Sequence, residues 1–271
     1  MREEHSELTS IGFVGAGRMG APMVKRLVEG GHDVEVVGRT DEKRCAAAAL
    51  GARAVADVTD IAPDADVVIV CVFTDDQVKQ LCLDGPLVHR MRPGAALVVH
   101  TTGSPRTVQA IATRFPHVDV IDAPVSGGPH DIAMGVVTLF VGGDERAVAR
   151  VQPVLGAYGD PIVHAGGTGS GQLVKLINNS MFAAQVGLVA EGVRLGARLG
   201  IDEGPLLGAL THGSAQSRVL SLIAGAGSAE KFSSAVGEFV GKDVAVVRRV
   251  VAELGGELGA LDVLINAGIR T

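Results

Sequence analysis

The chain is poor in aromatic residues and has no excess of positive charge. It holds 271 residues with no Trp, one Tyr and 3% aromatic residues in all. Its interior must therefore rely on small aliphatic side chains and glycine, which suit closely packed layers of helices and sheet. The formal net charge is −6. Nucleic acids and anionic membranes both reward clustered Lys and Arg, so we expect neither as a partner.

Cysteines and long apolar runs are scarce as well. The three cysteines, Cys45, Cys71 and Cys82, are an odd number without metal-ligand spacing, so we expect no metal site. No continuous apolar run reaches the roughly 18–20 residues of a membrane span. The first ten residues are charged and polar, unlike a signal peptide. Together these features predict a protein of the reduced cytoplasm.

The order of apolar and polar segments predicts an α/β fold followed by helices. Short apolar runs first alternate with helix-like segments, which is typical of βαβ units and a parallel sheet. From 172 to 200 there is no proline and apolar residues recur at helical spacing, which predicts one long helix joining two domains. The stretch 165–170 is rich in glycine and marks the boundary. We expect a domain with a parallel sheet at 1–168 and an all-helical domain at 169–271.

A G-x-G-x-x-G pattern lies between the first predicted strand and the first predicted helix. Its first glycine permits a tight turn, the second lets the backbone approach a pyrophosphate, and the third lets helix and strand pack closely. The phosphates then lie at the helix N-terminus. A turn that binds no ligand is the alternative. In this context the pattern predicts a dinucleotide site of the Rossmann type, with contacts from Gly15, Ala16, Gly17, Arg18 and Met19.

The end of the second predicted strand bears on which nicotinamide cofactor is bound. An NAD site usually has an Asp or Glu there, which accepts hydrogen bonds from the ribose hydroxyls. This chain instead has Arg39 and Thr40, with Lys43 and Arg44 close by. An arginine and a hydroxyl suit a 2′-phosphate, so we expect NADP, with NAD as the alternative. The other interpretation is an Arg39 that is only solvated.

Two polar residues near the start of the predicted long helix suit hydride transfer from an alcohol. Such a reaction needs a group that takes the hydroxyl proton. Lys175 and Asn179 are four residues apart and therefore share one helix face. A lysine near a positive helix terminus and a bound cofactor would have its pKa lowered toward neutrality. A solvent-facing lysine is the alternative.

Four sequence blocks, taken in order, resemble a known family. The first is GAGRMGAPM at 15–23, followed by GHDV at 31–34. The second is DAPVSGG at 122–128, and the third, at 166–179, has the form G-x-x-G-x-G-x-x-x-K-x-x-N-N. The fourth is the pair Lys242-Asp243. With these blocks the chain resembles the β-hydroxyacid dehydrogenase family, which includes 3-hydroxyisobutyrate dehydrogenase and tartronate semialdehyde reductase.

The resemblance implies both a fold and a reaction. The fold would be a Rossmann domain followed by an all-helical domain, assembled as a homodimer or homotetramer. The reaction would be oxidation of a small 3-hydroxy acid with NADP, or reduction of its semialdehyde. Lys175 would be the catalytic acid/base, and no metal would be needed. Thr102 would meet the cofactor near its nicotinamide, and Lys242 would close over the cofactor from the second domain.

The resemblance also implies a substrate site. Ser126, Gly127 and Gly128 would bind the substrate carboxylate through a hydroxyl and backbone N–H groups, and Asn179 would hydrogen-bond the substrate. The chain departs from the family pattern directly afterwards, where His130 and Asp131 introduce polar side chains. These two either recognise a polar arm of the substrate or form the hydrogen-bonded turn of the loop itself.

Two other functions are compatible with the same blocks. Imine reductases share the family architecture, but they generally lack a lysine at the position of Lys175. A non-catalytic protein could use the same fold to bind a dinucleotide alone, although such relatives typically lose the catalytic lysine. The presence of Lys175, Ser126 and Asn179 together favours the dehydrogenase.

Overall fold

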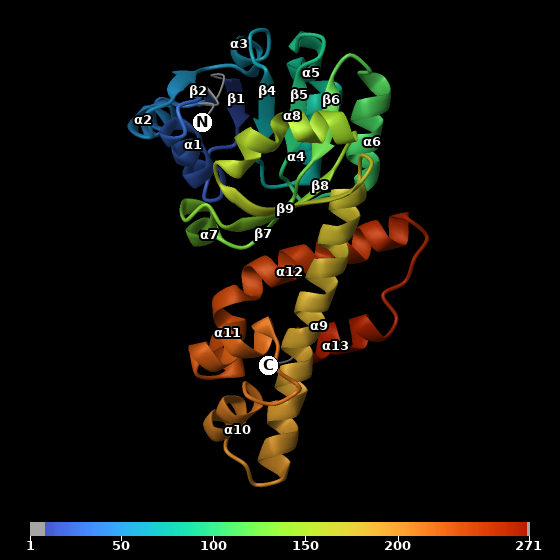
Figure 1. Cartoon of the computed structure of the whole chain (residues 1–271). Helices are drawn as coiled ribbons and strands as arrows, with labels where there is room; N and C mark the ends of the chain where they lie inside the picture. The colour runs from blue at the N-terminus through green and yellow to red at the C-terminus, as the bar shows by residue number, and fades with distance from the viewer. Residues whose placement is uncertain (1–8, 270–271) are drawn as a thin grey trace, which may run out of the picture. The chain divides into compact units, whose positions relative to one another are not determined.

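The computed structural model describes residues 9–269 and divides into two compact units (Figure 1). The first unit ends at Lys175 and the second begins at Leu176. The division falls inside one long helix, α9 (Ser170–Arg198), which begins in the first unit and continues through the second. The predicted long helix at 172–200 corresponds to α9.

The first unit is built on one sheet with the strand order β3-β2-β1-β4-β5-β6-β8-β7, and β9 pairs with β8. The strands from β3 to β6 pair in parallel, whereas β8 runs antiparallel to β6 and β7. The order reverses between β1 and β4, where Rossmann folds bind their ligand beyond the strand ends. The strands are β1 (Ser10–Val14), β2 (Asp33–Val37), β3 (Arg53–Val55), β4 (Val67–Val70), β5 (Ala96–Val99), β6 (Asp119–Asp122), β7 (Val125–Ser126), β8 (Val137–Gly142) and β9 (Gly159–Gly166).

Helices cover both faces of this sheet (Figure 1). The central strands are buried on both sides: Val67 and Ile69 of β4 join one core, and Val68 and Val70 join the other. Strands of this kind lack polar alternation because neither face meets water. The helices are α1 (Gly20–Glu29), α2 (Asp41–Ala49), α3 (Val58–Ile61), α4 (Asp75–Lys79), the π-helix η1 (Gln80–Asp84), α5 (Leu87–Arg90), α6 (Pro105–Arg114), α7 (Pro129–Ala133) and α8 (Glu145–Gly156). The predicted α/β fold with a Rossmann sheet is confirmed.

The second unit is helical throughout its described residues, as predicted. Besides the main part of α9 it contains α10 (Glu203–Leu210), α11 (Arg218–Ala226), α12 (Ala229–Glu253) and α13 (Ala260–Ile269). Glycine permits close packing of α13 on α9, because a Cβ at Gly187 would overlap the backbone oxygen of Leu264. By length and hydropathy α9 meets the criteria for a membrane-spanning helix. Core helices of soluble proteins meet the same criteria, and 44% of the most apolar 18-residue window of α9 is buried inside the protein.

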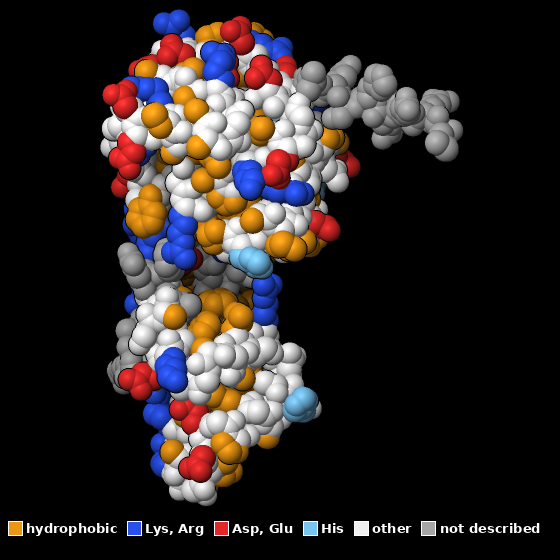
Figure 2. Space-filling view, turned by 90° about the vertical axis from the view of Figure 1, so that its left-hand side faces the viewer, with side chains coloured by type: hydrophobic (Ala, Val, Ile, Leu, Met, Phe, Trp, Pro, Cys, Tyr) orange, Lys and Arg blue, Asp and Glu red, His pale blue; other side chains and the backbone are white. Residues whose placement is uncertain are grey.

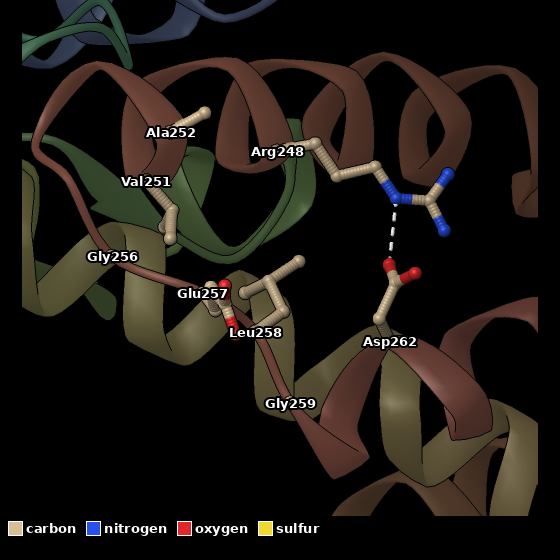
Figure 3. Close-up of a pocket in the computed structure, with 8 residues that line it drawn as sticks. All are labelled: Arg248, Val251, Ala252, Gly256, Glu257, Leu258, Gly259 and Asp262. Atoms are coloured by element: carbon tan, nitrogen blue, oxygen red, sulfur yellow. Dashed lines mark hydrogen bonds and ion pairs between the residues drawn. The ribbon is translucent and has the colours of Figure 1, made fainter.

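The surface of the second unit has two features outside its core. Apolar side chains are exposed on it (Figure 2). On α9 the exposed large apolar side chains include Ile177, Met181, Leu188 and Leu195. Between α12 and α13 there is an open hollow of about 370 Å³ (Figure 3). Its one ion pair joins the Arg248 Nε atom to an Asp262 carboxylate oxygen at 2.7 Å. The hollow contains none of the residues predicted to bind cofactor or substrate.

Candidate functional site

The loop between β1 and α1 has the shape expected of a phosphate-binding turn. Gly15 has φ +101°, and a Cβ there would overlap the backbone oxygen of Cys71, which follows β4. A Cβ at Gly20 would overlap the Gly15 carbonyl oxygen. Both glycines are therefore required by the packing of the chain itself. Gly17 differs, because a Cβ there would have no described atom within 4 Å apart from those of its two chain neighbours.

The space at Gly17 and the start of α1 fits the pyrophosphate of a dinucleotide. No side chain caps α1, whose N-cap residue is Met19, and its first turn has no acidic residue. The first N–H groups of a helix lack partners within it, and the helix dipole there favours an anion. A glycine with open space before its Cβ lets the phosphates approach the backbone. The predicted contacts from Gly15, Ala16, Gly17, Arg18 and Met19 all belong to this segment.

The loop after β2 contains an arginine, Arg39, whose guanidinium has no partner within the described residues. Thr40 caps α2, because its Oγ1 atom accepts a hydrogen bond of 3.3 Å from the Lys43 N–H. Arg44 donates to the Gly38 carbonyl oxygen at 2.8 Å and pairs with Asp41. Arg39 is exposed and makes no hydrogen bond or ion pair within residues 9–269. Arg39 is thus available to an anionic ligand, whereas the nearby carboxylate of Asp41 is engaged.

The loop after β5 holds Thr102 between two fixed neighbours. The Thr101 hydroxyl donates to the Val72 carbonyl oxygen at 2.9 Å, which ties this loop to the one after β4. On the other side Gln172 of α9 donates from Nε2 to the Thr101 carbonyl oxygen at 2.8 Å. Its Oε1 atom accepts from the Gly103 N–H at 2.9 Å. The hydroxyl of Thr102 makes no hydrogen bond within the described chain and so stays available to a ligand.

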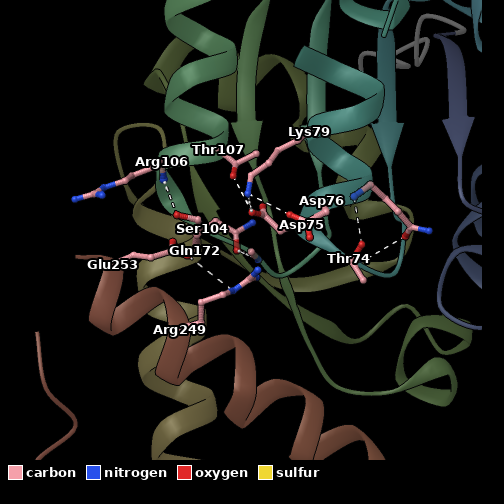
Figure 4. A network of polar contacts seen from close by, with 12 residues as sticks. Thr74, Asp75, Asp76, Lys79, Ser104, Arg106, Thr107, Gln172, Arg249 and Glu253 are labelled. Carbon is pink, nitrogen blue, oxygen red and sulfur yellow. Dashed lines mark hydrogen bonds and ion pairs between the residues drawn. The ribbon is translucent and has the colours of Figure 1, made fainter. Parts of the chain in front are cut away.

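A buried carboxylate, that of Asp75, lies beside the same loop, and Figure 4 shows it between Thr107 and Lys79 and near Ser104. Asp75 of α4 accepts a hydrogen bond of 2.9 Å from the Thr107 hydroxyl and pairs with the Lys79 Nζ atom at 3.1 Å. A Cβ at Gly103 would overlap the Asp75 carboxylate, so glycine is required where the loop passes over it. The loops after β4 and β5 are therefore joined by side chains as well as by the sheet.

The head of α9 is held by Asp122, the last residue of β6. This carboxylate is fully buried, and it accepts hydrogen bonds from the backbone N–H groups of Gly169 at 2.6 Å and Gln172 at 2.7 Å. Burial raises the pKa of the Asp122 carboxyl, while these hydrogen bonds oppose the rise. Asp122 opens the DAPVSGG block, and Lys175 lies one turn beyond Gln172. One carboxylate thus links the predicted substrate loop to the helix that carries Lys175.

The predicted substrate loop is partly occupied by a side chain of its own. The Gly128 N–H donates a hydrogen bond of 2.7 Å to the Oδ2 atom of Asp131, which caps α7. Asp131 therefore forms the turn of the loop itself, one of the two roles expected for it. Within residues 9–269, the Ser126 hydroxyl and the Gly127 N–H have no hydrogen-bond partner. These two groups remain available to a substrate carboxylate.

Lys175 and Asn179 are buried, with 9% and 8% of their surfaces exposed. A freely solvent-facing Lys175 is therefore excluded. In the second unit, the Asn179 Nδ2 atom donates to the Asp243 Oδ2 atom at 3.1 Å. The Lys242 Nζ atom lies 4.0 Å from the other oxygen of that carboxylate. The third and fourth sequence blocks, which carry Asn179 and Lys242, thus meet through Asp243.

Sequence reasoning missed a buried polar pair behind the substrate loop. His100 directly follows β5, and its Nδ1 atom lies 2.6 Å from the Ala123 carbonyl oxygen. Its Nε2 atom lies 2.8 Å from the hydroxyl of Tyr158, the only tyrosine of the chain. Burial lowers the pKa of His100 to about 4. The available signal was a histidine directly after an apolar strand pattern. Gln172 was missed as well, and its signal was its place inside the third block.

Two family models together match nearly all of the described chain. Residues 10–167 match the NAD-binding domain of 6-phosphogluconate dehydrogenase. Residues 169–264 match the NAD-binding domain of NADP-dependent 3-hydroxyisobutyrate dehydrogenase.

Individual proteins show the same similarity. An uncharacterized oxidoreductase of Shewanella frigidimarina is 36% identical over 78% of this chain and 74% of its own. An NAD-dependent L-serine dehydrogenase of Pseudomonas aeruginosa is 35% identical over 72% of this chain and 66% of its own. The solved structure of Mycobacterium tuberculosis 3-hydroxyisobutyrate dehydrogenase with L-serine has a TM-score of 0.86 at 27% identity, covering 97% of this chain and 93% of that one. An imine reductase of Bacillus cereus, at 18% identity and a TM-score of 0.67 over 96% of this chain and 92% of its own, shares the fold alone.

Proposed function

The chain belongs to the β-hydroxyacid dehydrogenase family, and on this premise we propose that it transfers a hydride between NADP(H) and a small 3-hydroxy acid or its semialdehyde. The observation that carries the proposal is the arrangement around the head of α9. Asp122 and Gln172 tie the substrate loop, the Thr102 loop and the helix of Lys175 to one another. Donors for a carboxylate and a buried amine are therefore supplied by connected elements.

In the proposed reaction Lys175 exchanges the proton of the substrate alcohol. The chemistry that a bound nicotinamide would supply is that of a hydride acceptor for the substrate carbon that bears the hydroxyl. Lys175 takes the hydroxyl proton as the carbon–oxygen double bond forms, and it returns that proton in the reverse direction. The Ser126 hydroxyl and the Gly127 N–H hold the substrate carboxylate, and Asn179 hydrogen-bonds the substrate. Gly128 would contribute only if its N–H were released from Asp131.

NADP is the proposed cofactor because Arg39 offers an uncommitted guanidinium at the end of β2. A guanidinium binds phosphate through paired, charge-assisted hydrogen bonds. The hydroxyl of Thr40 can still donate to a phosphate oxygen while its oxygen accepts from Lys43. Thr102 and Lys242 are the remaining proposed cofactor contacts. NAD is the alternative, and the L-serine dehydrogenase relative carries NAD in its name.

The direct test is nicotinamide absorbance with a panel of 3-hydroxy acids, each tried with NADP and with NAD. The panel contains 3-hydroxyisobutyrate, 3-hydroxypropionate, glycerate and L-serine, the last because two relatives are described with it. We expect turnover with NADP that Lys175→Met lowers by at least about a hundredfold, since proton transfer typically contributes 10²–10⁴. Binding of NADPH, followed by its fluorescence, should survive in Lys175→Met. If no acid of the panel is turned over while NADPH still binds tightly, the result would favour imine reduction or a non-catalytic dinucleotide-binding protein.

The proposed assembly is a homodimer, and the alternative is a homotetramer. The proposed location is the cytoplasm. The exposed apolar side chains of α9 support self-association, because water-exposed stripes of this kind usually face a partner. The chain has 24 basic against 30 acidic residues, so we propose neither nucleic acid nor membrane as a partner.

A further inference from the structure

Asp131 places a negative charge at the point where the substrate carboxylate would bind. Its Oδ2 atom accepts the Gly128 N–H at 2.7 Å, and a Cβ on Gly127 would lie 2.7 Å from the same atom. The carboxylate therefore touches both glycines of the substrate loop. One of the backbone donors suited to an anionic substrate is already used by the protein.

The charge of Asp131 is not neutralised by a basic side chain. Within residues 9–269, Asp131 forms no ion pair with Lys, Arg or His, and its Oδ1 atom makes no hydrogen bond. The side chain is only half-buried, so a bound ligand can reach it. A second carboxylate placed beside this one would be repelled, because the two negative charges would face each other without a basic side chain to neutralise either.

A substrate with a positive charge next to its own carboxylate would turn this repulsion into attraction. In a 3-hydroxy acid that bears an ammonium group on carbon 2, the ammonium lies one carbon from the carboxylate. With the carboxylate on the Ser126 hydroxyl and the Gly127 N–H, the ammonium can donate to the free Oδ1 atom of Asp131. A plain 3-hydroxy acid has no group that could do this.

We propose that Asp131 is a specificity-determining residue, whose carboxylate selects 3-hydroxy acids that carry an ammonium group on carbon 2 over those that do not. The inference rests on the proposed dehydrogenase function and narrows its substrate class. It also gives the departure from the family pattern at this position a chemical role besides capping α7.

The test compares two substrates of similar size, L-serine and 3-hydroxyisobutyrate, by kcat/KM with NADP and with NAD. Asp131→Asn keeps an oxygen that can accept the Gly128 N–H but removes the charge. We expect the wild-type chain to prefer L-serine and the ratio of the two kcat/KM values to fall about tenfold in Asp131→Asn. Asp131→Glu keeps the charge and should retain the preference for L-serine.

The matched control is Asp144→Asn. Asp144 also caps a helix, accepting from the N–H groups of Arg146 and Ala147, but it lies outside the substrate loop. Its substitution should leave the substrate ratio unchanged. Wild-type preference for 3-hydroxyisobutyrate, or an equal ratio in the wild type and Asp131→Asn, would overturn the inference and leave the dehydrogenase standing. No turnover of any panel acid by the wild type would overturn the proposed function itself, and this inference with it.

Discussion

Asp122 shows how one buried carboxylate can hold a strand end and the start of a helix together. It accepts two backbone N–H groups at the start of α9 and lies four residues before Ser126. Gln172 extends the same connection to the carbonyl of Thr101 and the N–H of Gly103. Buried polar groups that are fully hydrogen-bonded favour one arrangement of the chain over others, because any alternative leaves them unpaired. The position of Lys175 is therefore set mainly by Asp122 and Gln172, neither of which has a part in the proposed proton transfer.

His100 makes the stability of the first unit depend on pH. Its pKa is lowered to about 4 in the folded protein, against 6.5 for an ordinary histidine, because the ring is fully buried. Between these values the unfolded chain binds a proton that the folded chain does not. The free energy of unfolding is therefore not reduced by His100 above about pH 6.5. Below that pH it falls, and the fall levels off near pH 4 after a total loss of about 3 kcal/mol.

Urea unfolding at several pH values between 7 and 4 measures this loss. His100→Gln should be less stable at neutral pH, but its stability should fall less steeply with acid than that of the wild type. His130→Gln, which changes an exposed histidine of the same unit, should keep the wild-type slope. Equal slopes in His100→Gln and the wild type would contradict a neutral, buried His100.

At the scale of elements, the turn between β1 and α1 contains glycines that the fold requires and one, Gly17, that the packing of the chain leaves free to change. Gly17→Ala adds a methyl group where the described chain, apart from the two neighbouring residues, has no atom within 4 Å. We expect an unchanged melting temperature and a loss of NADPH affinity of at least about tenfold, because the methyl group would stand where the phosphates approach. Fluorescence titration with NADPH and thermal unfolding measure the two effects.

Gly15→Ala is the matched comparison, two residues away in the same turn. Here the added methyl group overlaps the Cys71 backbone oxygen and the residue has φ +101°, so the fold itself should lose about 1–3 kcal/mol. Wild-type affinity for NADPH in Gly17→Ala would show that the phosphates do not approach this point.

A helix, strand or turn could be predicted from the sequence where the residues that determine it are close together in the chain. The glycine turn, the alternation of strands and helices in the first unit and the long helix each have a pattern in the local sequence, and all three are present in the structure. The connections between the elements have no such pattern. Asp122 and Gly169 are 47 residues apart, and Gln172 and Thr101 are 71 apart. The capping role of Asp131 was open for a different reason, since a polar residue in a loop suits a turn and a ligand equally well.

At the scale of the whole molecule, one face of α9 predicts self-association. Met181, Leu188 and Leu195 are each about half exposed and are spaced seven residues apart, so they form one stripe along the helix. Covering a large aliphatic side chain is worth roughly 1.5–3 kcal/mol. The double variant Leu188→Glu, Leu195→Glu should therefore convert a dimer into a monomer, as measured by analytical ultracentrifugation, while circular dichroism shows that it remains folded.

Leu222→Glu provides the control for this change. Leu222 is also exposed, at 44%, but it belongs to α11 and lies outside the stripe. Its substitution should leave the assembly unchanged. A wild-type chain that sediments as a monomer, or a double variant that stays dimeric, would contradict a role of this face in assembly.

The scarcity of aromatic residues gives the protein an internal optical probe. With no tryptophan present, near-ultraviolet emission comes almost entirely from Tyr158, which is fully buried in the first unit and hydrogen-bonded to His100. That emission therefore reports the melting of the Rossmann unit by itself, whereas far-ultraviolet dichroism reports the helices of both units. Two transitions that fail to coincide in one heating scan would reveal that the units unfold independently. The blue fluorescence of a reduced nicotinamide would, in the same cuvette, appear against an almost dark protein background.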